Sequence, residues 1–324
     1  MDSSQPGITY ARARLYLGIT GVGTGVVLAS AGLALGWPLQ LAASGHGFAW
    51  LLVSYLLLSL PFDLLGGYLL PRRFSRPTPT LPAFLAALVR AQLLHAGFLW
   101  LAASAILAAG REAAVPGVLA VVSLGMLLLL LARPVIAALI GGRGPVSEMA
   151  ALRLRAAGQN GSRLRGILVA FGWNVAGVAV AAWATGADVS REEGVITLAL
   201  GFSLWSFLGL LLLPSISRPA VLATDLALLS RGVTRSALES YIVQTDRELD
   251  DEPVRAKWIE RIFHPIPSVA ARRAALERAT APSWGADEAA RLALYLSWAS
   301  LGLLSRAVHC NSGKPGYWVY LPRD

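Results

Sequence analysis

The sequence predicts an all-α protein, a polytopic membrane bundle of about six transmembrane helices with a small C-terminal helical cytoplasmic domain. Hydrophobic residues make up 55% of the chain and charged residues 15%, and the mean hydropathy is +0.58. Such a composition is typical of a protein whose surface faces lipid. Long apolar runs fill residues 1–214, whereas residues 215–324 mix polar and apolar positions at helical spacing.

Six apolar runs reach or approach the roughly 20 residues that a helix needs to cross about 30 Å of hydrocarbon. The predicted spans lie near residues 15–36, 47–70, 93–110, 115–141, 166–185 and 195–213. The first run is as long as a true span and has no convincing cleavage site, so we expect it to stay in the protein.

Arginines fall on one side of this predicted topology. They precede the first span, follow the second and occupy the loop between the fourth and fifth, as Arg12, Arg14, Arg72, Arg73, Arg76, Arg143, Arg153, Arg155, Arg163 and Arg165. Because positive loops stay in the cytoplasm during insertion, we expect both termini there, with the bacterial cytoplasmic membrane as the location. The net charge of +9 reflects this bias. The tail has no basic face with interleaved aromatics, which argues against nucleic-acid binding.

The tail reads as a series of short helices. Thr234 and Ser268 are placed to cap helices, and Pro265 must end the helix that precedes it because proline cannot donate a backbone hydrogen bond. Residues 287–306 form an amphipathic segment too short to span, which we expect to pack on the bundle or to lie at the bilayer surface. The aromatic end, residues 311–324, could bind a partner as an edge strand or fold back on its own domain.

Three separated stretches resemble one family. They are Pro61 to Phe74, Ser217 to Asp225, and Phe263 to Ser268 followed by Arg272. The second is similar to an S-R-x-x-E-x-x-A-D segment and the third to a His-Pro segment that leads into an Arg-containing helix. Together they resemble the integral-membrane zinc metallopeptidases of the CAAX prenyl endopeptidase and HtpX-like family, over most of residues 55–280.

The resemblance implies a zinc site that this chain cannot build in the family's way. Such enzymes bind zinc with H-E-x-x-H on a helix and a downstream Glu. Here no two of the four histidines, His46, His95, His264 and His309, are four residues apart. Val221 stands at the position of the Glu ligand. We therefore expect no metal, no cofactor and no catalytic residue, and a remnant motif of Ser217, Arg218, Val221, Asp225, His264, Pro265 and Arg272.

Three hypotheses for function follow. The first is a catalytically inactive scaffold that binds a protein, peptide or lipid partner. The second is an accessory subunit of a larger membrane complex, so the expected partners are membrane lipids and another membrane protein. The third, less favoured, is an active hydrolase with a rebuilt site at His264, Asp225 and Asp246.

Polar side chains inside predicted spans are costly and mark candidate sites. Asp63, Arg90 and His95 are these candidates. We expect Asp63 to pair with Arg90 or Arg72, with a hydrophilic cavity as the alternative. Asp225 is expected to anchor its helix through a hydrogen bond or a pair with Arg218.

Overall fold

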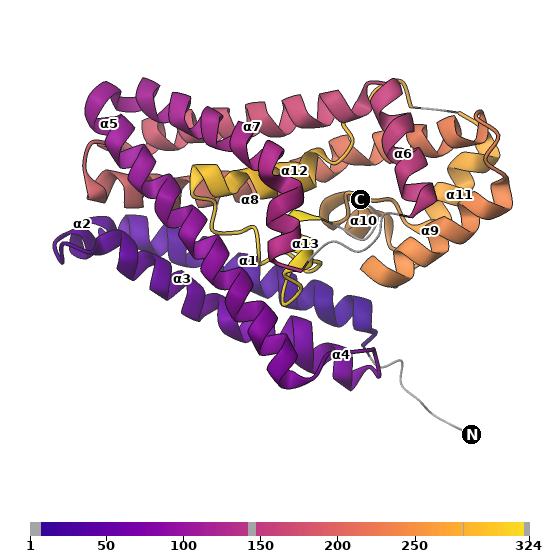
Figure 1. Ribbon diagram of the computed structural model, residues 1–324, viewed down its shortest axis with the longest axis horizontal. Helices are drawn as coiled ribbons and strands as arrows, with labels where there is room; N and C mark the ends of the chain where they lie inside the picture. Colours follow the sequence, from indigo (N-terminus) through magenta and orange to yellow (C-terminus); the bar gives the residue numbers. More distant parts are fainter. Residues whose placement is uncertain (1–7, 142–146, 281, 321–324) are drawn as a thin grey trace.

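The computed structural model describes residues 8–141, 147–280 and 282–320, and every regular element within them is helical (Figure 1). The all-α prediction is confirmed. The helices are α1 (Tyr10–Ala34), α2 (Trp37–Ala42), α3 (Gly47–Leu64), the π-helical turn η1 (Leu65–Leu69), α4 (Leu70–Arg73), α5 (Leu81–Leu139), α6 (Glu148–Gln159), α7 (Ser162–Thr185), α8 (Glu192–Leu229), α9 (Arg235–Leu249), α10 (Lys257–Phe263), α11 (Val269–Arg278), α12 (Ala289–Leu296), the 3₁₀ turn η2 (Ser297–Ser300) and α13 (Gly316–Val319).

Five helical stretches of the described chain are long and apolar enough to cross a membrane: α1, Gly47–Arg73, α5, α7 and α8. The predicted third and fourth spans are joined in the 59-residue α5. Its backbone leaves helical geometry at Ala113 and Ala114, and Figure 1 shows the chain turning back at that point. Six spans were predicted and five long apolar helices are found among the described residues, because the predicted third and fourth spans are the two halves of the kinked α5.

Helix α8 is longer than the sequence predicts. The expected span ends at residue 213, but α8 continues through Pro214 and Pro219 to Leu229. The two prolines cannot donate to the carbonyls four residues before them, those of Leu210 and Ser215, yet the helix continues. Near this point the Ala286 N–H donates to the carbonyl of Ile216 at 3.1 Å. One helix therefore carries both the apolar span and residues 217–225 of the remnant motif.

The C-terminal segment differs most from its prediction. Instead of an amphipathic helix over 287–306, α12 covers only Ala289–Leu296, and all its residues are buried. It packs against α5, α7 and α8 in the middle of the molecule (Figure 1). Residues 215–324 therefore do not form one separate domain, because α12, η2 and α13 contribute to the core of the bundle.

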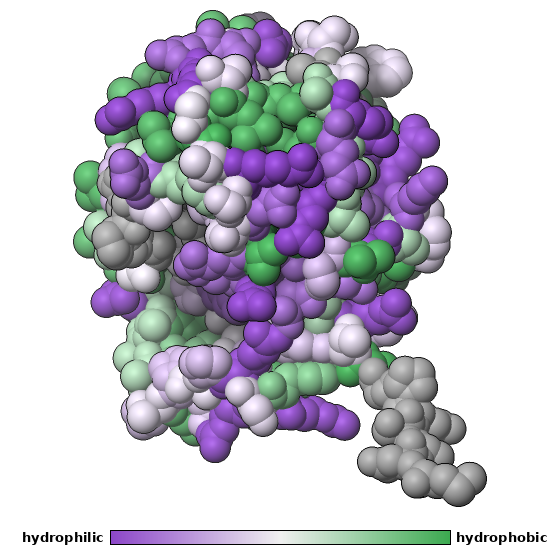
Figure 2. Space-filling model, turned by 90° about the vertical axis from the view of Figure 1, so that its right-hand side faces the viewer, coloured by the Kyte–Doolittle hydropathy of each residue, from purple (hydrophilic) through white to green (hydrophobic). Residues whose placement is uncertain are grey.

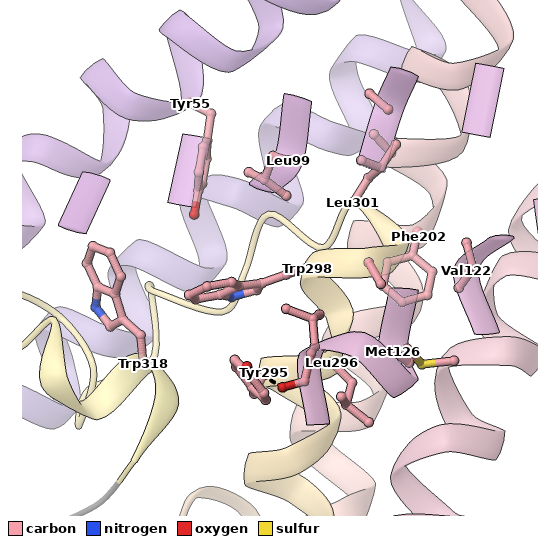
Figure 3. Packing of buried hydrophobic residues seen from close by; sticks show 14 of the residues in the cluster. Tyr55, Leu99, Val122, Met126, Phe202, Tyr295, Leu296, Trp298, Leu301 and Trp318 are labelled. Carbon is pink, nitrogen blue, oxygen red and sulfur yellow. Dashed lines mark hydrogen bonds between the residues drawn. The ribbon is translucent and has the colours of Figure 1, made fainter. Parts of the chain in front are cut away.

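Aromatic side chains fill the centre of this core (Figure 3). Trp298 and Tyr295 are each 1% exposed, with ring centroids 5.4 Å apart. The Tyr295 hydroxyl donates to the Leu129 carbonyl at 2.8 Å, so its polar end is satisfied within α5. Trp318 of α13 is also buried, and its indole N–H donates to the Asn311 carbonyl. The aromatic end thus folds back on its own chain as far as Tyr320, and residues 321–324 lie outside the described residues.

A second, smaller core joins α6, α8, α9 and α11 at one end of the molecule. Thr234 and Ser268 accept hydrogen bonds from the backbone N–H groups of Ala237 and Ala271, which confirms both predicted caps. Helix α10 ends at Phe263, directly before His264 and Pro265, as predicted. Hydrophilic residues cover much of this end (Figure 2).

Candidate functional site

The first part of the remnant motif, residues 217–225, lies on α8, whereas His264 and Pro265 follow α10 and Arg272 belongs to α11. Ser217, Val221 and Asp225 are four residues apart, so they point the same way, and each is 1% exposed. The Ser217 hydroxyl accepts a hydrogen bond from the Ala290 N–H at 3.1 Å. Ser217 therefore holds the first turn of α12 against α8.

Asp225 pairs with two arginines, and neither is the predicted Arg218. Arg272 donates from Nε to Oδ2 at 2.7 Å and from Nη2 to Oδ1 at 2.8 Å, and Arg153 also donates to Oδ1. Arg272 and Arg153 come from α11 and α6, where their side chains are buried. The motif residues Asp225 and Arg272 thus meet in an ion cluster that joins three helices.

Val221 lies where the family resemblance places a glutamate ligand. Its side chain packs in a small apolar cluster with Leu249 and Ile266, beside Tyr317. An alkyl group cannot coordinate a metal. The structure therefore uses this position for packing.

A polar cluster lies next to this apolar one. Asp250, at the end of α9, meets His264, at the end of α10, and His309, from the segment between η2 and α13. Asp250 Oδ2 is 3.3 Å from Nδ1 of His264, and Oδ1 is 3.1 Å from Nε2 of His309. The two imidazole rings stand edge to face, 5.0 Å apart. Three segments far apart in the sequence thus converge on one carboxylate.

Two buried arginines support this cluster from outside. Arg255 donates to Asp250 Oδ2 at 3.1 Å, to Asp246 at 2.7 Å and to the Ile266 carbonyl. Arg14 of α1 donates to the carbonyls of Leu249 and His309 at 2.8 and 2.6 Å. The backbone on either side of the cluster is therefore fixed.

Burial and neighbouring charges set the protonation of this cluster. Burial raises the pKa of Asp250, but His264 and Arg255 outweigh it and hold the pKa well below its usual range. Burial lowers the pKa of His309 to about 4, although its contact with Asp250 acts in the other direction. At neutral pH Asp250 is therefore ionised and His309 is neutral.

The three intramembrane candidates, Asp63, Arg90 and His95, do not form one site. Asp63 is buried, and its carboxylate accepts from the Gly313 N–H at 2.9 Å and from Gln92 at 3.3 Å, with Arg306 Nη2 at 3.8 Å. Its cationic neighbour is thus Arg306 rather than the predicted Arg90 or Arg72. Arg72 instead donates to the Tyr68 hydroxyl, and Arg90 is exposed.

His95 lies in an aromatic cage. It is fully buried, with ring centroids 4.4 Å from Trp298, 5.7 Å from Trp318 and 5.9 Å from Tyr55. Neither ring nitrogen has a hydrogen-bond partner among the described residues. Among the described residues, His95 therefore makes no hydrogen bond to Arg90 or to the cluster around Asp250.

A chamber of about 680 Å³ lies between α1, α2, α3, α8 and the C-terminal segment. Its walls are mostly apolar, and its polar side chains include Tyr55, Ser59, Asp63 and Arg306. The Arg306 guanidinium donates to the Tyr55 hydroxyl at 3.1 Å and to the Ser59 hydroxyl. Its Nη1 is buried and has no hydrogen-bond partner in the part of the chain that the structure describes.

Sequence reasoning missed Asp250, His309, Arg153 and Arg306. The first two carry no spacing pattern with His264 that a ligand motif would predict. A comparison of the chain with protein-family models, with curated proteins and with solved structures found no match. The resemblance to membrane zinc peptidases therefore stays a prediction from the residues.

Proposed function

We propose that this protein is a membrane-embedded binding protein without peptidase activity, which holds an amphiphilic molecule in the chamber beside α1, α3 and α8. The chamber is the observation that carries the proposal. Its volume of about 680 Å³ lies within the roughly 300–1,000 Å³ of small-molecule sites. Apolar walls with a few convergent polar groups are also typical of such sites.

The chemistry of the chamber indicates what it would hold. A long hydrocarbon chain would replace lipid or water along the apolar walls. Asp63 largely balances the charge of Arg306, so the polar end favours a hydrogen-bond acceptor over a bare anion. An uncharged acceptor such as an ester carbonyl oxygen would match the Arg306 guanidinium that lines the chamber.

The absence of peptidase activity rests on the remnant motif. Val221 packs with Leu249 and Ile266, and the Asp225 carboxylate forms ion pairs with Arg153 and Arg272. Neither group can activate water. We place the protein in the bacterial cytoplasmic membrane with both termini in the cytoplasm, on the strength of its basic loops.

The test is to identify what the protein carries. The full chain would be purified in mild detergent and examined by native mass spectrometry, with extraction and identification of any bound lipid. In Ser54→Trp the indole would take up part of the chamber, whereas Leu57→Trp places the same side chain on the exposed face of α3, where Leu57 is 64% exposed.

We expect occupancy by the amphiphile to fall about tenfold in Ser54→Trp, equivalent to about 1.4 kcal/mol, and to stay at the wild-type level in Leu57→Trp. Equal occupancy in both variants, or a wild-type protein that carries no amphiphile, would contradict the proposal. A stoichiometric complex with another membrane protein, with the chamber empty, would instead favour an accessory subunit.

A further inference from the structure

The cluster of Asp250, His264 and His309 has the composition of a metal site. One oxygen and two imidazole nitrogens lie within 4.8 Å of one another. We propose that these three side chains bind one divalent transition-metal ion, with zinc as the best fit, and that the ion fastens the C-terminal segment to α9 and α10. This inference is independent of what the chamber holds.

The distances suit such an ion. Zinc binds nitrogen and oxygen ligands at about 2.0–2.1 Å, and tetrahedral geometry then places neighbouring ligand atoms about 3.3 Å apart. Asp250 Oδ2 lies 3.3 Å from Nδ1 of His264, and the other oxygen, Oδ1, lies 3.1 Å from Nε2 of His309, so the carboxylate faces both rings and would bind an ion between them through one or both oxygens. Two imidazoles with one carboxylate are a ligand set that zinc commonly takes.

The surroundings have the form of an outer shell. Ligating carboxylates are generally hydrogen-bonded by a second residue, and here Arg255 donates to Asp250. Arg14 fixes the carbonyls of Leu249 and His309, so the backbone at two ligands is held before an ion arrives. Because Asp246 also pairs with Arg255, the guanidinium charge is shared between two carboxylates.

A small cavity borders the cluster. It measures about 50 Å³ and is lined by Asp250, His264, His309 and their neighbours. Nε2 of His264 is buried and has no partner among the described residues. Its other lining residues are mostly apolar, among them Leu210, Phe263 and Leu294, so the cavity offers a bound ion little beyond these three side chains. It has no room for a peptide, so the ion would act as a structural clamp.

This site differs from the one that the family resemblance implies. That site would use the position of Val221 and a pair of histidines four residues apart. The proposed site instead uses His309 of the C-terminal segment, which also lies against α1: a side chain at Gly18 would meet the backbone of His309 at 2.5 Å. Metal binding here would therefore tie the beginning and the end of the chain to the polar end of the molecule.

The experiment measures metal content and its dependence on two histidines. The full chain, purified in detergent, would be stripped with a chelator, dialysed against zinc and analysed for metal by mass spectrometry. The variants are His264→Gln and His309→Gln. The matched control is His46→Gln, because His46 is exposed before α3.

We expect about one zinc per chain in wild type and His46→Gln, and less than about a tenth of that in His264→Gln and His309→Gln. Cobalt in place of zinc should give the visible absorption of a tetrahedral site. Wild-type protein without stoichiometric metal, or histidine variants that retain it, would overturn the proposal.

Size-exclusion profiles show whether the variants are folded. If neither histidine variant can be purified, the proposal is tested on the wild type alone, by its melting temperature with and without zinc. A higher melting temperature with zinc but not with magnesium supports the site, since only a ligand of the native state stabilises it. No zinc-dependent change would refute it.

Discussion

Arg272 offers a sharp test of the ion cluster that joins α6, α8 and α11. Asp225 is 1% exposed and accepts two hydrogen bonds from Arg272 and one from Arg153. In Arg272→Met two charge-assisted bonds are lost, each worth about 1.5–3 kcal/mol. Breaking a buried ion pair from one side costs about 3–5 kcal/mol, which agrees with that sum. We therefore expect a loss of stability of about 3–5 kcal/mol.

The assay is the melting temperature in detergent, followed by fluorescence-detected size exclusion. At about 2 °C per kcal/mol for a chain of this size, Arg272→Met should melt about 6–10 °C below the wild type. Arg273→Met is the matched control, because Arg273 is half exposed and pairs with Glu239 at 3.5 Å, an interaction worth at most about 1 kcal/mol. A shift in Arg272→Met no larger than that in Arg273→Met would refute the reasoning.

Three further predictions use the same measurement. Burial lowers the pKa of Lys314 from 10.5 to about 7, so between these values the unfolded chain binds more protons than the native one. Native stability should therefore gain from this residue as pH rises from about 7 to 9, and Lys314→Met should lose that gain; identical pH profiles would contradict the burial. Trp298→Ala should cost about 3–5 kcal/mol, whereas Trp183→Ala, 83% exposed in the wild type, should change little; similar losses would argue against the central position of Trp298. Gly67→Ala should destabilise by about 1–3 kcal/mol, because its Cβ would lie 2.1 Å from the Gly313 carbonyl oxygen, whereas Gly23→Ala meets nothing within 4 Å; a tolerated Gly67→Ala would show that the C-terminal segment can move away.

The sequence predicted what depends on local pattern. Apolar runs predicted the long helices, and the caps at Thr234 and Ser268 and the break at Pro265 follow from side chains acting on their own backbone. The kink in α5, at Ala113 and Ala114, falls in the short loop predicted between two spans, where residues 111–114 are less apolar than their surroundings. Such signals need no knowledge of distant contacts.

The place of the C-terminal segment could not be predicted in this way. Residues 287–306 were predicted to pack on the bundle or to lie at the bilayer surface, because their apolar run is too short to span. They do pack against α5, α7 and α8, but the sequence could not show that they lie in the core with charges such as Arg291 and Arg306. Inside the fold these charges have partners: Arg291 donates to Asn311 and the Tyr317 carbonyl, and Arg306 donates to Tyr55 and lies 3.8 Å from Asp63. The cost of burying a charge depends on its partners, and those partners come from other parts of the chain.

The candidate site, too, has residues that the sequence predicted and residues that only the fold reveals. The motif residues Ser217, Asp225 and Arg272 were identified, but only the fold shows that Arg153 joins them. The cluster at Asp250 was not predicted, because His264 and His309 lie on different segments and share no spacing rule. Sequence spacing can predict ligands that lie on one helix. It cannot predict ligands that come from three separate segments.

The central position of α12, η2 and α13 has a consequence for biogenesis. These elements are translated after every long apolar helix, so the helices must enter the bilayer before their shared interior exists. Until then Asp63 has no Gly313 amide, and Asn174 of α7 has no Ala293 carbonyl to bind. We expect insertion to yield a loose, hydrated intermediate that closes only when the last segment docks, and nascent chains halted before residue 289 to be protease-sensitive.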